Sequence, residues 1–107
     1  MRLLLQDRFA LLGILPATGN FVTLKIVRKL REDLSTSEEE VKRSGLVQEG
    51  KNVRWDQAKD DGKEIQIGEI ATEMIKEKLK EMNDKEELAS NHLTIYELFV
   101  EGEKEKA

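Results

Sequence analysis

The sequence predicts an α+β fold built as one small domain. Apolar residues recur at helical spacing over residues 21–33 and 68–83, which is typical of helices with one buried face. Residues 46–55 form two short runs around a glycine-containing turn, the pattern of an antiparallel β-hairpin. We therefore expect a helical N-terminal half, a small antiparallel sheet and two C-terminal helices in a single compact domain, residues 1–102. A charged, frayed tail, residues 103–107, is expected to follow this domain.

The N-terminal segment predicts a short buried strand and then a helix. Residues 3–5 are the apolar run of the strand, and Asp7 would cap the helix, because its carboxylate accepts from free backbone N–H groups of the first turn. Pro16 ends this helix, since the residue before a proline is pushed away from helical angles. In the turn that follows, Thr18 or Asn20 would cap the next helix.

The clearest helix is the one predicted over residues 21–33, where apolar side chains share one arc and basic side chains lie opposite. Residues 35–40 then contain three serine or threonine residues, each followed three positions later by glutamate, which is the capping-box spacing. A third helix is therefore expected to run to about Ser44. Gly45 would end it in the left-handed conformation that glycine adopts without strain.

The middle of the chain predicts the hairpin and a polar loop. In the hairpin, Val47 and either Val53 or Trp55 would supply the inward side chains. Residues 56–63 contain no apolar residue except one alanine, so we expect an exposed loop. Residues 64–67 predict a further short strand beside the hairpin.

Two helices are predicted in the C-terminal part of the chain. The first runs from Gly68 to about Asn83, with a stripe of apolar side chains and lysines and glutamates facing water. The second begins at Ser90 or Asn91, because apolar residues again recur at helical spacing.

The inward faces of these elements define an expected core. Replacing Leu30 or Ile70 of this core by alanine is expected to cost about 2–5 kcal/mol. The expected core residues are Phe9, Leu12, Leu15, Leu24, Val27, Leu30, Val47, Ile70, Met74, Leu79, Tyr96 and Phe99.

The composition gives little support for catalysis or for metal binding. The chain has no cysteine, which excludes thiolate zinc sites and thiol nucleophiles. Its one histidine, His92, is expected to be a surface or helix-capping imidazole. Residues 56–61 look like a calcium loop, but Ala58 and Ile67 stand at its third and twelfth positions, where the loop needs oxygen ligands. We therefore expect a protein that is not an enzyme and that binds no cofactor and no metal.

Charge is distributed unevenly, which leaves nucleic-acid binding open. Residues 1–32 carry six Lys or Arg against two Asp or Glu, whereas residues 33–107 carry twelve against twenty. Three helices followed by a hairpin is also the element order of winged-helix DNA-binding proteins. Three glutamates at the start of the third helix weigh against this alternative, because they would repel phosphates. The residues that would contact nucleic acid are Lys25, Arg28, Lys29, Lys51 and Arg54.

A protein-interaction module is the interpretation that the sequence favours. Trp55 is the only tryptophan, and tryptophan is a frequent anchor of protein interfaces, although a core or half-buried packing role is favoured for this one side chain. Ile95 and Leu98 lie off the apolar stripe of the last helix, so a second copy of the chain is expected to cover them. We expect a protein partner, or self-association as a homo-oligomer.

Two long stretches, DRFALLGILPATGNFVTLKIVRKLREDLSTSEEE and HLTIYELFVE, resemble short uncharacterised proteins of tailed-phage and prophage genomes. The resemblance implies a small assembly, host-takeover or regulatory factor and no catalytic residues. No apolar run approaches the ~18 residues that span a bilayer, so we expect a cytoplasmic protein without membrane contact.

Overall fold

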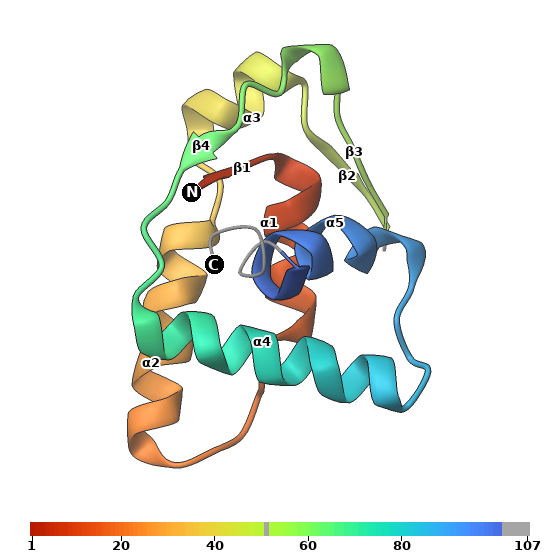
Figure 1. Ribbon diagram of the computed structural model, residues 1–107. Helices are drawn as coiled ribbons and strands as arrows, with labels where there is room; N and C mark the ends of the chain where they lie inside the picture. Colours follow the sequence, from red (N-terminus) through yellow and green to blue (C-terminus); the bar gives the residue numbers. More distant parts are fainter. Residues whose placement is uncertain (51, 102–107) are drawn as a thin grey trace.

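The computed structural model describes residues 1–50 and 52–101, which form the α+β fold predicted from the sequence (Figure 1). The predicted tail, residues 103–107, lies outside the described residues. In chain order the elements are β1 (Arg2–Leu3), α1 (Leu5–Ile14), α2 (Phe21–Leu34), α3 (Glu38–Ser44), β2 (Val47–Glu49), β3 (Asn52–Arg54), the 3₁₀ turn η1 (Gln57–Lys59), β4 (Lys63–Glu64), α4 (Glu69–Asp84), the 3₁₀ turn η2 (Ser90–His92), α5 (Leu93–Tyr96) and the π-helical turn η3 (Glu97–Glu101).

The central element is α1, which contacts α2, α4 and α5. In Figure 1 it runs through the middle of the molecule. Helix α2 lies to its left, and α4 crosses in front of its lower end. A helix surrounded in this way must be apolar on most sides, and Leu5, Leu11 and Ile14 are all buried. The N-terminal segment, which is apolar except for Gln6, Asp7 and Arg8, is therefore the centre of the core.

The strands form two separate antiparallel pairs, not one sheet. The hairpin pairs β2 with β3, as predicted, whereas β4 pairs with β1, so that Arg2 lies opposite Glu64. The expectation that the strand near residues 64–67 joins the hairpin is therefore wrong. Pairing with β1 buries Leu3 and Ile65 together in the core, which pairing with the exposed hairpin would not do.

Helix caps follow the sequence signals closely for α2 and α3. The side chain of Asn20 accepts a hydrogen bond from the N–H of Thr23 at 2.8 Å. Among the three possible capping boxes before α3, Ser37 and Glu40 form the real one, with reciprocal bonds of 3.1 and 3.2 Å. Gly45 ends α3 with a φ of 69°, as predicted.

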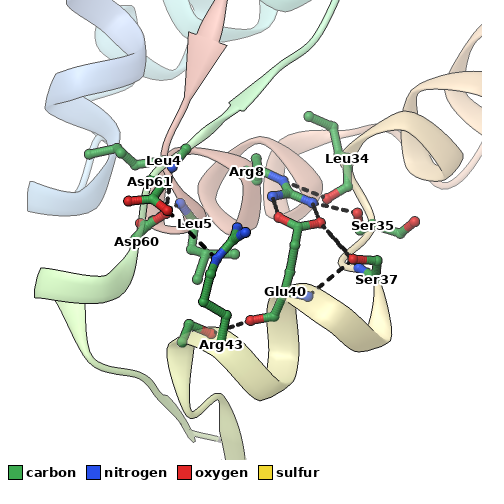
Figure 2. Close-up of polar contacts among 12 residues, drawn as sticks. Leu4, Leu5, Arg8, Leu34, Ser35, Ser37, Glu40, Arg43, Asp60 and Asp61 are labelled. Atoms are coloured by element: carbon green, nitrogen blue, oxygen red, sulfur yellow. Dashed lines mark hydrogen bonds and ion pairs between the residues drawn. The ribbon is translucent and has the colours of Figure 1, made fainter.

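The start of α1 differs from the prediction. Asp7 stands at the third position of the helix, where its carboxylate accepts the N–H of Leu4 at 3.3 Å, so it is not the N-cap residue. A distant carboxylate, that of Asp60, accepts the N–H of Leu5 at 2.8 Å (Figure 2). Burial raises the pKa of Asp7 above its ordinary value, against the lowering effect of the Leu4 N–H, and the charge of Asp60 raises it further.

Several predicted core residues lie elsewhere. Leu24 and Val47 are 40% and 49% exposed, and Ile70 is 71% exposed. Val47 and the alternative inward residue Val53 are exposed because β2 and β3 have no buried residue on either face. Leu15, Val27, Leu30, Leu79 and Phe99 are buried as predicted, while Phe9, Leu12, Met74 and Tyr96 are half-buried.

The last helix presents a different face from the one expected. Ile95 is fully buried, so the prediction that it lies off the core-facing stripe is wrong, whereas Leu98 is exposed. Phe99 and Val100 are buried with Ile95, because the chain widens into a π-helical turn that brings both side chains inward.

Arg8 is a fully buried charge at the junction of three helices (Figure 2). Its Nε donates to the carbonyl of Leu34 at 3.2 Å and its Nη2 to the carbonyl of Ser35 at 2.5 Å. Its two terminal nitrogens also bind both oxygens of the Glu40 carboxylate, at 2.5 and 3.2 Å. One side chain of α1 thus satisfies carbonyls at the C-terminal end of α2 and binds α3 through an ion pair.

We predict that Glu40→Gln lowers the free energy of unfolding by about 3 kcal/mol, because it leaves the buried guanidinium without a counter-charge. The matched control is Glu39→Gln, an exposed neighbour in the same helical turn, which should change stability by no more than about 0.5 kcal/mol. Urea denaturation of the three proteins measures both values, and equal stabilities for the two variants would contradict the role of the ion pair.

Acid should remove the contribution of this ion pair. The hydrogen bonds from Arg8 lower the pKa of Glu40 from 4.5 to about 2, against a raising effect of burial. Because the folded-state pKa is the lower one, the stabilisation is complete above pH 4.5 and is lost as the pH falls toward 2. The difference in melting temperature between the natural protein and Glu40→Gln should therefore shrink over that interval. Asp7 titrates in both proteins, so its opposite contribution cancels in the difference.

Candidate functional site

An open groove lies between α2 and the beginning of α4. Its volume is about 740 Å³. Ile26 and Leu30 of α2 and Ile70 and Ala71 of α4 supply its apolar lining. The polar lining residues are Lys25, Lys29, Asp33, Gln66 and Glu69. We call this feature the α2–α4 groove.

Large apolar side chains are exposed in and next to the α2–α4 groove. Ile70 is 71% exposed, and Phe21 and Val22 in the first turn of α2 are 74% and 63% exposed. Val22 precedes Ile26 by four residues, so both lie on the side of α2 that faces the groove. Figure 1 shows the N-terminal end of α2 extending past α4, which explains why no element covers this turn. Exposed apolar patches beside a groove mark surfaces that bind other molecules.

The two sides of the groove carry opposite charge. On α2, Lys25 places its Nζ 5.4 Å from the centre of the Phe21 ring, a cation–π contact. Lys29 lies 2.9 Å from Asp33, and the hydrogen bond to that carboxylate raises the pKa of Lys29. Arg28 is exposed on the same helix. The α2 side is therefore mainly basic.

The α4 side is acidic beyond its first apolar residue. Glu73, Glu77 and Glu81 are exposed and follow Ile70 at intervals of three, four and four residues, so all four side chains lie along one stripe of the helix. Glu81 also accepts a hydrogen bond from Lys85 at 2.8 Å, which lowers the pKa of Glu81. The exposed stripe of α4 that starts at the groove is thus acidic, whereas the groove lining itself contains Lys25, Lys29, Asp33 and Glu69.

The residues predicted for nucleic-acid binding do not form one surface. Lys25, Arg28 and Lys29 share α2, but Arg54 lies on the hairpin, at the other side of the molecule in Figure 1. Arg54 forms an ion pair of 2.5 Å with Glu49 on the neighbouring strand. The remaining predicted residue, Lys51, lies outside the described residues.

The predicted interface residue Trp55 packs on α1. Its ring meets Phe9 edge to face, with 5.4 Å between centroids and an interplanar angle of 63°. The residue is half-buried, and its indole N–H is buried with no hydrogen-bond partner among the described residues. The other two predicted interface residues differ from each other, since Ile95 belongs to the core and Leu98 is exposed.

His92 has a structural role in the described part of the chain. Its Nδ1 accepts the N–H of Ala89 at 2.9 Å, so the imidazole caps the short turn η2, one of the two roles predicted. In residues 1–50 and 52–101, no three histidine, aspartate or glutamate side chains lie close enough together to hold a metal ion.

Comparisons with protein-family models, with curated proteins and with solved structures find no match to this chain. The resemblance to phage proteins therefore stays a prediction. Among the described residues, no helix is both long and apolar enough to cross a bilayer.

The α2–α4 groove is not predicted from the sequence, because the helical pattern of residues 68–83 places Ile70 in the core. A signal was present: Ile70 shares its stripe with Glu73 and Glu77, whereas Ala71 heads the stripe that turns inward. An apolar residue among exposed acidic neighbours is typical of a surface anchor.

The sequence predicts the same loss of stability for Leu30→Ala and Ile70→Ala, whereas the structure predicts different losses. Leu30→Ala removes a buried side chain and should lower the free energy of unfolding by about 2–5 kcal/mol. Ile70→Ala removes an exposed one and should change it by no more than about 0.5 kcal/mol. Thermal or urea denaturation distinguishes the two, and a large loss for Ile70→Ala would show that this side chain is covered in solution.

Proposed function

We propose that this chain is a non-enzymatic protein-binding domain, and that the α2–α4 groove receives an acidic amphipathic segment of its partner. The observation that carries the proposal is the exposure of Ile70 in the groove and of Val22 and Phe21 in the adjoining first turn of α2, a helix that supplies Lys25 and Lys29 to the groove. Exposing three such side chains to water has a cost that a bound partner would remove.

The shape of the groove supports a helical segment as the bound form. Two helices form its sides, as in proteins that hold an amphipathic helix by two or three apolar anchors. Ile26, Leu30 and Ala71 would contact those anchors. Lys25 and Arg28 would attract acidic residues of the bound segment. Lys29 already pairs with Asp33, whereas Lys25 and Arg28 form no ion pair with the described residues of α2.

The nucleic-acid alternative has weaker support. Lys29 and Arg54 already face carboxylates, and α3 begins with three glutamates, of which Glu40 binds Arg8. Duplex DNA would use the α2 cations without using the apolar lining of the groove. Sensitivity to Ile70 therefore separates the two functions.

The test is a titration of the protein into a fluorescent, glutamate-rich amphipathic peptide with leucines at helical spacing, read by anisotropy. A scrambled peptide of the same composition is the control for charge alone. We expect the amphipathic peptide to bind, and Ile70→Glu to weaken it by about tenfold or more.

The matched control is Leu93→Glu, which places the same charge on an exposed apolar position of α5, away from the groove. This variant should bind the peptide like the natural protein. Equal binding of scrambled and amphipathic peptides, or loss of binding in Trp55→Ala only, would contradict the proposed site. Binding of random-sequence duplex that collapses between about 50 and 200 mM salt would support the nucleic-acid alternative instead.

A further inference from the structure

We infer that the partner for the α2–α4 groove is a second copy of this chain, paired about a two-fold axis so that α2 of each copy faces α4 of the other. This inference rests on the proposed function, because it uses the same groove. It names the source of the acidic segment as the stripe formed by Ile70, Glu73, Glu77 and Glu81.

The first argument is that the chain itself carries the complement of its own basic helix. The stripe on α4 begins with an exposed apolar anchor and continues with three exposed carboxylates, of which Glu73 and Glu81 also pair with Lys76 and Lys85 of the same chain. The α2 side offers exposed apolar residues in its first turn, followed by Lys25 and Arg28. The two surfaces are complementary. The carboxylates of α4 would face the cations of α2, and Ile70 would contact the exposed apolar residues in the first turn of α2.

The second argument is symmetry. Lys25 lines the groove on its α2 side and Ile70 lines it on its α4 side, and the acidic stripe continues along α4 from Ile70. A two-fold rotation about the groove can therefore place α2 of each copy against α4 of the other. Ile70, which lines the groove between them, would then lie close to the axis and contact apolar residues of the other copy. A different partner would need only one of the two stripes, and the other would remain unexplained.

The interface can be tested by reversing each stripe separately. In one variant Lys25→Glu and Arg28→Glu make both stripes acidic, and in the other Glu77→Lys and Glu81→Lys make both basic. Glu73 is left unchanged because it lies 3.5 Å from the buried Lys76. Each variant should repel its own copies, whereas a mixture of the two should pair in equal amounts, because both contacts are then between opposite charges.

Sedimentation velocity over a series of concentrations gives the oligomeric state. We expect the natural protein to form dimers, and Ile70→Glu and each charge-reversed variant to raise the dimer dissociation constant by about tenfold or more. The equimolar mixture of the two reversed variants should recover the dimer. The control variant Glu39→Lys with Glu97→Lys has the same net charge as the basic variant but alters α3 and η3, and it should dimerise normally.

Folding of each variant is checked by its thermal melt, so that a monomer is not mistaken for an unfolded chain. A protein that stays monomeric at every concentration while still binding the acidic peptide would overturn this inference and leave the proposed function in place. Loss of peptide binding as well would overturn both. A dimer that is indifferent to Ile70→Glu and to the charge reversals would place the interface elsewhere and overturn the inference.

Discussion

The arrangement of the first three helices depends on the buried guanidinium of Arg8. Placing a charge where water cannot reach is costly unless the charge is paired and hydrogen-bonded, and here each of the three guanidinium nitrogens has at least one acceptor. The acceptors come from the C-terminal end of α2, where the helix dipole is negative, and from Glu40 of α3. The burial of this side of α1 therefore depends on contacts from both α2 and α3.

The orientation of α2 that this contact sets has a consequence at the opposite end of the helix. Its C-terminal end is bound at the junction, while its middle packs through Val27 and Leu30 into the core. The first turn, with Phe21 and Val22, then extends past α4 and remains exposed (Figure 1). The same contact that closes the interior at one end of α2 thus leaves an open apolar surface at the other.

Local features of the fold were predictable, and long-range ones were not. Asn20, Ser37 and Gly45 act within one helical turn, so their roles follow from residue type and spacing alone. The burial of Arg8 and the pairing of β4 with β1 depend on partners 26 or more positions away, which a short window of sequence does not contain. The groove could not be predicted for a related reason. Ile70 lies in the first turn of α4, and the sequence pattern alone does not show whether a neighbouring helix covers it.

Trp55 gives the molecule an internal reporter of one local event. It is the only tryptophan of the chain, it immediately follows the exposed hairpin, and its ring rests on Phe9 of α1. Detachment of the hairpin from α1 would bring the indole into water and shift its emission to longer wavelength, even with every helix intact. Intrinsic fluorescence therefore follows the contact of Trp55 with α1, whereas far-ultraviolet circular dichroism follows the helices. Any separation of the two transitions on heating would measure how loosely the hairpin is attached to the helical core.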